Sequence, residues 1–194
     1  MNQQTSTLQV SDSRLRENWL ADLLIRPLHE VDLLSLEWEG RYTHFRRLYR
    51  QAYQRAERGN AVLWVADLPA NKVLGQVFVL LRSEVDAQVA DGKSKAFIHS
   101  FRVRPEDRNA GLGRRLLANA ESDLIRRGFG SVTLNVAIEN SAAIRFYERA
   151  GYVRSGRDEG YWTYLDHRGR ERDVHEPSWK MSKKLHVIQI SGDL

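Results

Sequence analysis

The chain has 194 residues, enough for one ordinary α/β domain with a full core but cramped for two. The absence of cysteine excludes a disulfide framework, a thiol nucleophile and a thiolate metal site. The net charge of +5 and the pI near 9.6 are compatible with nucleic acid binding, but the basic residues are dispersed among acids, so nucleic acid is not expected as a partner.

The sequence predicts neither a membrane span nor a secretion signal. The longest apolar run, Val77–Leu81, is far too short to cross a bilayer. The first residues also lack the charged-then-apolar pattern of a signal peptide. We therefore expect a cytoplasmic protein with no membrane partner.

The hydrophobic pattern divides the chain into a polar N-terminal arm over residues 1–22, one domain over 23–187 and a short tail over 188–194. The arm is aperiodic, and a short helix near Arg14–Leu23 is the one regular element it suggests. The first half of the domain predicts a strand at Leu23–Pro27, helices over His29–Glu39 and Tyr42–Arg58, strands at Ala61–Ala66 and Val73–Leu81 joined by a turn at Leu68–Asn71, and a charged loop at Asp86–Ser94.

The second half of the domain alternates strands and helices. It predicts, in chain order, a strand from Ala96, a helix from Leu112 that Gly128 ends, a strand at Ser131–Ala137, a helix at Ala142–Arg149, and one long antiparallel hairpin formed by Tyr152–Tyr164 and Asp173–Leu185. Two strands followed by strand–helix–strand–helix–strand are typical of a single-domain α/β fold, with a mixed sheet and helices on both faces.

The most informative segment connects the strand from Ala96 to the helix that follows it. A proline-marked exit leads into an Arg-x-x-Gly-x-Gly turn, Arg108–Gly113, and Arg114 begins the arginine pair in the first helical turn. Free backbone N–H groups and the positive end of the helix dipole make such a position an anion site, most often for phosphate. Gly111 and Gly113 let the backbone approach the ligand closely. The sequence therefore predicts a cofactor-phosphate site.

Spacing separates the cofactor classes that use glycine-rich turns. A nucleotide-triphosphate P-loop needs G-x-x-x-x-G-K-[ST], a pattern that the sequence does not contain. A dinucleotide fingerprint needs a small residue three positions after Gly113, where the chain has Leu116. It also needs a ribose-binding acid about 20 residues on, where the next strand offers Asn135 and then Glu139. The short turn that remains does not by itself identify the cofactor.

Two motifs in the second half give the turn a context. Arg108–Gly113 reads R-x-x-G-x-G, and Asn140–Tyr152 reads N-x-x-A-x-x-x-Y-x-x-x-G-Y. In this order and at this separation they resemble the coenzyme A turn and the second signature of the GNAT superfamily of acyl-CoA-dependent N-acyltransferases. The close match runs from about Ala96 to Val153. The resemblance implies a single-domain GNAT-like α/β fold with a mixed, mostly antiparallel sheet, and acetyl-CoA as co-substrate.

The resemblance also implies which residues bind the coenzyme. In the family, the strand before the turn is splayed from its neighbour, so that backbone groups of residues 101–103 contact the acetyl-pantetheine arm, while the turn holds the pyrophosphate. The coenzyme-binding residues implied are Phe101, Arg102, Val103, Arg108, Asn109, Ala110, Gly111, Leu112, Gly113, Arg114, Asn140 and Tyr147.

Two residues of the second signature have alternative roles. In similar enzymes the tyrosine at the position of Tyr147 points at the coenzyme sulfur as general acid, and a phenol is a reasonable donor to a departing thiolate; the alternative is a core aromatic. Asn140 immediately precedes a helix and should cap its N-terminus. The resemblance also gives Asn140 a hydrogen bond to the pantetheine arm, and both roles stay open.

The general base has two candidates. Many relatives carry a glutamate on the strand before the turn, and at that position this chain has His99, whose imidazole suits proton transfer near neutral pH. His99 could equally be a hydrogen-bonded core residue. Glu37 and Glu39 end the first expected helix, which in this fold borders the acceptor pocket, so either could bind a cationic amine. Both could equally be solvated surface acids.

The sequence thus predicts an acyltransferase that transfers an acetyl group from acetyl-CoA to a small-molecule amine or a protein amino group. Direct attack on the thioester is expected because neither a cysteine nor a visible serine triad offers an acyl-enzyme. The alternative is a coenzyme A-binding sensor or regulatory module without turnover, because the strand glutamate is missing. A homodimer is compatible with the resemblance, and the histidines have no metal-ligand spacing.

Overall fold

The computed structural model describes residues 22–68 and 72–186, so the predicted short helix of the arm, the tip of the 68–71 turn and the predicted 188–194 tail lie outside the described residues. Its elements, with η for a 3-10 helix, are β1 (Leu24–Pro27), η1 (Glu30–Glu37), η2 (Thr43–Phe45), α2 (Arg46–Glu57), β2 (Ala61–Leu68), β3 (Lys72–Leu80), β4 (Lys95–Val103), η3 (Pro105–Asp107), α3 (Leu112–Arg126), β5 (Ser131–Ala137), α4 (Ser141–Arg149), β6 (Val153–Asp158), β7 (Tyr161–Leu165), β8 (Glu171–His175) and β9 (Ser178–Lys184). None of the helices in these two ranges is long and apolar enough to cross a membrane.

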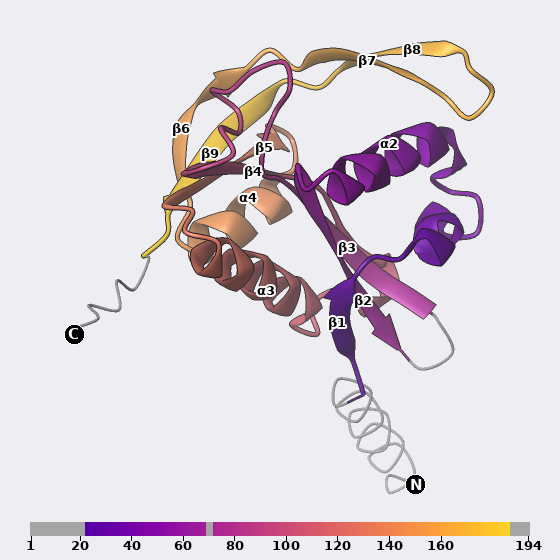
Figure 1. Ribbon diagram of the computed structural model, residues 1–194, viewed down its shortest axis with the longest axis horizontal. Helices are drawn as coiled ribbons and strands as arrows, with labels where there is room; N and C mark the ends of the chain where they lie inside the picture. Colours follow the sequence, from indigo (N-terminus) through magenta and orange to yellow (C-terminus); the bar gives the residue numbers. More distant parts are fainter. Residues whose placement is uncertain (1–21, 69–71, 187–194) are drawn as a thin grey trace, which may run out of the picture.

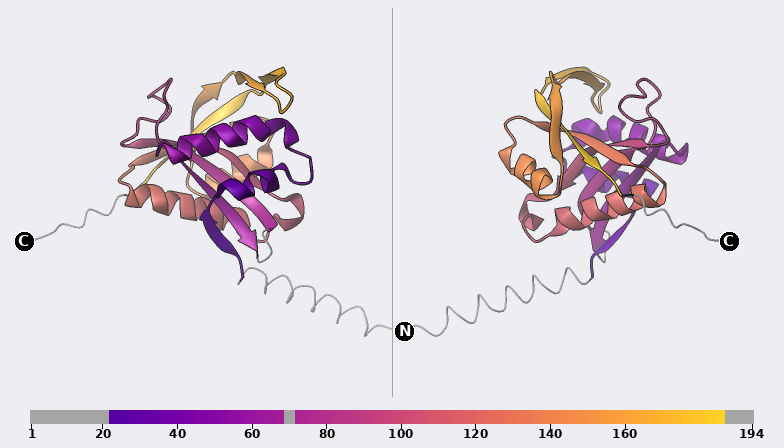
Figure 2. Two further views of the ribbon diagram at one scale, coloured as in Figure 1. Left: turned by 45° about the vertical axis from the view of Figure 1, so that its right-hand side comes forward. Right: turned by 90° about the vertical axis from the view of Figure 1, so that its left-hand side faces the viewer.

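Seven strands form the main sheet in the order β1-β2-β3-β4-β5-β9-β6. Every neighbouring pair is antiparallel except β4 and β5, which run parallel with α3 as their crossover. Helices α3 and α4 cover one face of the sheet and α2 the other (Figures 1 and 2). The predicted mixed, mostly antiparallel sheet with helices on both faces is confirmed.

Each face of the sheet has its own hydrophobic core. On the α3 face, α3 contributes Leu116 and Leu124 to a cluster that includes Ile98 of β4. On the α2 face, Tyr49 and its neighbours cover Phe78 of β3. Because side chains alternate along a strand, β2 and β3 supply residues to both cores, whereas the core residues of β4 and β5 belong to the α3 face. A residue's position in its strand therefore decides on which face of the sheet its side chain packs.

The segment predicted as a helix over 29–39 forms the short 3-10 helix η1 instead. A 3-10 helix repeats every three residues, which places Leu33 and Leu36 together against the α2-face core. Leu34, by contrast, is 69% exposed. The helix then ends at Trp38 and Glu39, which both have positive φ angles of 44° and 54°. The chain turns there toward the end of β4.

The predicted single hairpin at the C-terminal end is divided into two sheets. β6 and β9 join the main sheet, whereas β7 and β8 pair only with each other. The division occurs at Gly160, which has a φ of +72° and whose backbone approaches that of Glu176. A Cβ at Gly160 would lie 1.9 Å from the Glu176 carbonyl oxygen. The β7–β8 arm extends over α2 (Figure 1), where Tyr164 contacts Phe45 with ring centroids 5.2 Å apart.

Candidate active site

The parallel strands β4 and β5 separate halfway along their length. They are paired from Lys95 opposite Ser131 to Ile98 opposite Leu134. Beyond this point β4 continues to residue 103 and β5 to residue 137 with no pairing between them. The edge of β4 over residues 99–103 that faces β5 thus lacks a strand partner, and backbone groups at such an edge can bind an extended ligand. This opening agrees with the splayed strand that the resemblance implies.

The other edge of β4 contains a β-bulge. His99 is opposite Phe78 and Arg102 is opposite Gln76, so two β4 residues occupy the space of one β3 residue. Ser100 takes up the extra length with a φ of +50°, and its carbonyl accepts a hydrogen bond of 3.2 Å from the fully buried Gln76 side chain. The bulge shifts, by one residue, the alternation of β4 side chains between the two faces of the sheet. Phe101 therefore points to the α3 face, whereas the side chains of His99 and Arg102 contact aromatic residues of the α2 face.

The glycine turn has the geometry of an anion site. Gly111 is the N-cap of α3 with a φ of +87°, and Asn109 has a φ of +63°. Within the described residues, none of the backbone N–H groups of residues 109–114 donates to a backbone carbonyl. Arg108 and Arg114 are exposed beside these groups, and the Nε of Arg108 donates to the Val103 carbonyl over 3.1 Å. The turn thus offers free N–H groups at a helix N-terminus among positive charges.

The side chain of Tyr147 reaches β4 from α4. Its ring centroid lies 6.2 Å from that of Phe101 and 5.2 Å from that of Phe146. A Cβ placed on Gly113 would lie 3.7 Å from Phe146 and 3.8 Å from Phe101, so the turn belongs to the same cluster. Tyr147 is 8% exposed, and burial raises the pKa of its phenol above the usual range. The structure therefore brings the two sequence motifs together around a tyrosine that stays protonated.

Asn140 caps α4. Its Oδ1 accepts a hydrogen bond of 3.1 Å from the Ala143 N–H, and its side chain is exposed. The capping role predicted from the sequence is thus confirmed. The second role, a contact with the pantetheine arm, stays a prediction.

His99 lies on the α2 face among aromatic rings. Its ring centroid is 5.7 Å from that of Phe78, and its Nδ1 is 3.2 Å from the hydroxyl of Ser100. Burial, together with the positive charges of Arg55 and Arg102, lowers the pKa of His99 to about 4. The imidazole is therefore neutral at pH 7, and its basicity is weak.

We expect the imidazole of His99 to titrate near pH 4 rather than near the usual 6.5. Because the pKa is lower in the folded state, the unfolded chain binds more protons between these values, so the free energy of unfolding falls as the pH is lowered through this window. NMR titration of the histidine rings, with the His99 signal assigned from its loss in His99→Asn, measures the midpoint. A midpoint above about 6 would contradict the burial of this ring.

The two glutamates predicted to bind substrate are both bound to arginines. Glu37 is 4% exposed, and its carboxylate accepts bonds of 2.5 and 2.8 Å from Arg46 and of 2.7 Å from Thr43. The Arg46 guanidinium accordingly lowers the pKa of the Glu37 carboxyl. Glu39 accepts two bonds of 2.8 Å from Arg104. Glu37 thus fixes the start of α2, which is a structural role that its position in the sequence did not reveal.

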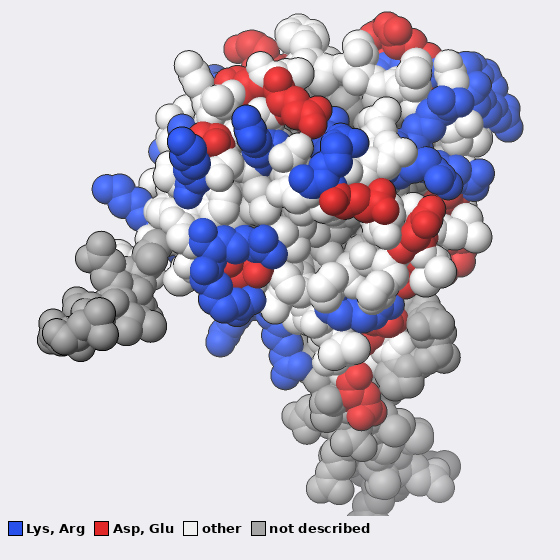
Figure 3. All heavy atoms as spheres, in the orientation of Figure 1, with Lys and Arg blue, Asp and Glu red and all other residues white. Residues whose placement is uncertain are grey.

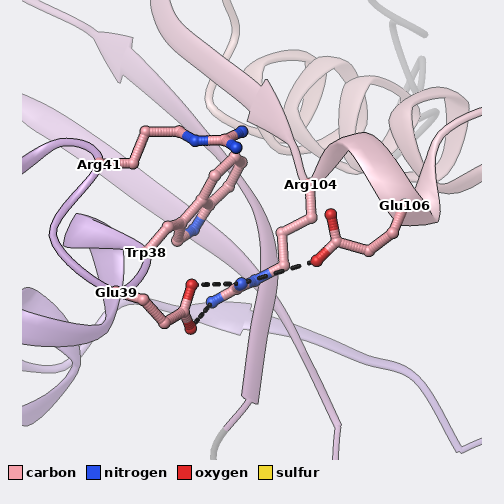
Figure 4. A pocket seen from close by; sticks show the side chains of 5 residues that line it. All are labelled: Trp38, Glu39, Arg41, Arg104 and Glu106. Carbon is pink, nitrogen blue, oxygen red and sulfur yellow. Dashed lines mark hydrogen bonds and ion pairs between the residues drawn. The ribbon is translucent and has the colours of Figure 1, made fainter.

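A pocket of about 430 Å³ lies between the end of η1 and the end of β4 (Figure 4). Its wall contains Arg104, which is 7% exposed, lies over the Trp38 ring at 5.2 Å and donates to the Val73 carbonyl over 2.9 Å. The residues that line the pocket are Trp38, Glu39, Arg41, Arg104 and Glu106. Basic and acidic side chains are interspersed over much of the face drawn in Figure 3.

Two side-chain arrangements of the site were not predicted from the sequence. The side chain of Gln76 stabilises the β4 bulge through its hydrogen bond to Ser100. The one indication of this role in the sequence was a polar side chain in the middle of an apolar strand. The Arg102 side chain lies over the rings of Tyr42 and Phe45, and the sequence indicated neither these contacts nor the face of the sheet on which the side chain lies. Its position depends on the bulge, and no local pattern in the sequence indicated the bulge.

Comparisons with known proteins bear on the family and the fold. The model of the Acetyltransferase (GNAT) family matches residues 29–152. The ribosomal protein bS18-alanine N-acetyltransferase of Escherichia coli is 34% identical over 77 residues, which cover 40% of this chain and 51% of that protein. Mycothiol acetyltransferase of Cellulomonas flavigena is 32% identical over 91 residues, which cover 46% of this chain and 26% of that protein. The chain thus spans about half or less of these curated relatives.

Solved structures share the fold at low identity. Ard1 from Thermoplasma volcanium aligns with a TM-score of 0.65 at 20% identity, over 85% of this chain and 99% of that one. Spermidine N-acetyltransferase from Vibrio cholerae, solved with CoA and spermine, aligns with a TM-score of 0.60 at 18% identity, over 85% of this chain and 96% of that one. The family model spans more than half of the sequence. The chain therefore belongs to the GNAT acetyltransferase family.

Proposed function

We propose that the protein is an N-acetyltransferase that transfers an acetyl group from acetyl-CoA to a primary amine by direct attack on the thioester. One observation carries the proposal: the open edge of β4, the free N–H groups before α3 and the buried Tyr147 of α4 lie together. The co-substrate supplies an acyl group that is already activated. The protein's own tasks are to bind and orient both substrates and to move protons.

The residues of the site fit coenzyme A in charge and shape. The backbone N–H groups of residues 109–114, with Arg108 and Arg114 beside them, suit a pyrophosphate. The unpaired edge of β4 suits the amide groups of a pantetheine arm, which would bind as an added strand. Backbone N–H groups at Phe101 to Val103 would then also be available to the acetyl oxygen.

We assign proton donation to Tyr147 and amine positioning to His99. A buried phenol with a raised pKa keeps its proton and can give it to the departing thiolate. The pKa of about 4 makes the His99 imidazole a poor acceptor for a full ammonium proton. Its neutral ring can accept a hydrogen bond from an attacking amine, which would release its proton to water.

A coenzyme A sensor without turnover is the second candidate. It is favoured because the residues that could act as general base are weakly basic or already bound by an arginine. His99 is weakly basic, and the Glu37 carboxylate is bound by Arg46. A binding module would keep the turn and the splayed strand and would need no base. The relatives named above carry the names of acetyltransferases for protein and small-molecule amines, which supports the enzyme as the first candidate.

The test combines calorimetry with an assay for released coenzyme A thiol. We expect acetyl-CoA to bind with micromolar affinity, and NAD and ATP to bind much more weakly. We expect thiol release in the presence of at least one class of primary amine, offered as amino acids, peptides and polyamines. Binding with no thiol release from any amine would identify the sensor, and no binding would refute both candidates.

A further inference from the structure

The guanidinium of Arg102 is held in place by aromatic side chains. Its carbon lies 4.4 Å from the ring centroid of Tyr42 and 4.9 Å from that of Phe45. Its Nη1 donates a hydrogen bond of 2.7 Å to the hydroxyl of Tyr49. The side chain is partly buried. These contacts fix the direction of the guanidinium without neutralising its charge.

Two other arginines with little exposed side-chain surface are paired with carboxylates. Arg26 binds both Asp32 and Asp67, at 2.6 and 2.7 Å. Arg104 binds Glu39 at 2.8 Å. Arg102 makes no ion pair with any of the residues that the structure describes. A guanidinium has five N–H donors, and a partly buried cation with no anion is costly unless a ligand completes its partners.

The position of Arg102 places this charge at the site of the proposed reaction. Its backbone belongs to the open edge of β4, and its side chain shares the α2 face with His99. The charges that act on His99 come from Arg55 and Arg102. The glutamates considered for a cationic amine, Glu37 and Glu39, are already bound by arginines. Electrostatically, this region favours an anionic group on the acceptor.

We propose that the acceptor is an amine that carries a carboxylate close to its amino group, and that Arg102 binds this carboxylate. The inference rests on the proposed acetyltransferase function and names its substrate class. The planar guanidinium can donate two parallel hydrogen bonds to a carboxylate. Holding the acceptor by its acid group would orient the amino group toward the open edge of β4. The carboxylate can belong to a free amino acid or to an acidic residue at a peptide N-terminus.

The test measures kcat/KM for matched acceptors that differ by one carboxylate. Glycine against glycinamide represents free amino acids, and Asp-Ala-Ala against Asn-Ala-Ala, both as C-terminal amides, represents peptides. We expect the acid to be preferred by about tenfold or more in at least one pair, which identifies the source of the carboxylate. In Arg102→Gln this preference should fall by about the same factor, because kcat/KM for the acid should fall by about tenfold more than kcat/KM for the amide. Comparing each ratio between parent and variant cancels differences in amine pKa.

Two further variants separate recognition from packing. Arg50→Gln removes a positive charge from the exposed side of α2, where the nearest acid is Glu30 at 3.8 Å, and should leave the preference unchanged. Tyr49→Phe keeps the charge of Arg102 but removes its hydrogen bond, and should reduce the preference by less than Arg102→Gln does. If Arg102→Gln fails to fold, Tyr49→Phe and Arg102→Lys provide the same comparison.

The outcomes distinguish this inference from the function on which it rests. An equal loss for acid and amide in Arg102→Gln would show a packing role and overturn the inference. A parent enzyme that prefers the amides, or polyamines, would also overturn it while leaving the acetyltransferase in place. Acetyl-CoA binding with no thiol release from any amine would refute the acetyltransferase and this inference together.

Discussion

Replacing Tyr147 by phenylalanine is expected to lower kcat by roughly 10²- to 10⁴-fold, the usual effect of removing a general acid, while acetyl-CoA affinity stays nearly unchanged. The ring would keep its contacts with Phe101 and Phe146, because only the hydroxyl is lost. Within the described residues the hydroxyl of Tyr147 makes no hydrogen bond that would fail in the variant. Thiol release under saturating acetyl-CoA measures kcat, and calorimetry measures the affinity.

The same helix region offers a matched control for this prediction. Tyr152 is also a buried tyrosine, its ring centroid lies 5.5 Å from that of Tyr147, and burial raises the pKa of its phenol as well. Tyr152→Phe should therefore reproduce any general effect of removing a buried hydroxyl and leave kcat close to that of the parent. Similar losses of kcat in both variants would argue against a specific proton donor. Full activity in Tyr147→Phe would remove Tyr147 from the mechanism.

Replacing Gly111 by alanine is expected to weaken acetyl-CoA binding by about tenfold or more, because the methyl group would stand where a phosphate must approach the backbone. The φ of +87° also strains any residue other than glycine, by roughly 1–2 kcal/mol. Apart from its neighbours in the chain, no atom of the described residues lies within 4 Å of the added Cβ. A loss of affinity would therefore report on the ligand and not on a clash within the fold. Calorimetry with acetyl-CoA measures it.

The opposite end of α3 provides the control for Gly111. Gly128 has a φ of +86°, and an added Cβ there also meets no atom within 4 Å. Gly128→Ala should cost a similar free energy of unfolding, measured by urea denaturation, but should leave acetyl-CoA affinity unchanged. If the two variants change affinity equally, the effect belongs to backbone strain, and the phosphate site at Gly111 is refuted.

Local patterns in the sequence predicted the elements that carry the proposed coenzyme site. Glycines with positive φ, an asparagine N-cap and apolar residues at helical spacing are each set by nearby residues. The turn at Arg108–Gly113, the capped helix after Asn140 and the strand–helix alternation therefore appear in the structure where the sequence placed them. The resemblance to the GNAT family, carried by these motifs, was confirmed by the family match.

The sequence failed where a long-range contact decides the outcome. One hairpin was predicted, but the close approach of Gly160 and Glu176 divides it. An α-helix over 29–39 was predicted, but packing of Leu33 and Leu36 on the sheet selects a 3-10 helix. When a β-bulge interrupts a strand, counting residues along the sequence does not give the face of the sheet on which a later side chain lies.

What the sequence by itself determined is the fold class, the family and the glycine turn at Arg108–Gly113, because the motifs that indicate them consist of residues close together in the chain. The tertiary structure alone decided how the charged side chains near the end of β4 are paired. Glu37 meets Arg46 through a turn, Glu39 meets Arg104 across 65 positions, and Arg102 meets Tyr49 across 53. Burial and ion pairing depend on which groups the fold brings within a few ångströms. For that reason a surface that the sequence predicted to attract a cation is one for which we propose a carboxylate ligand.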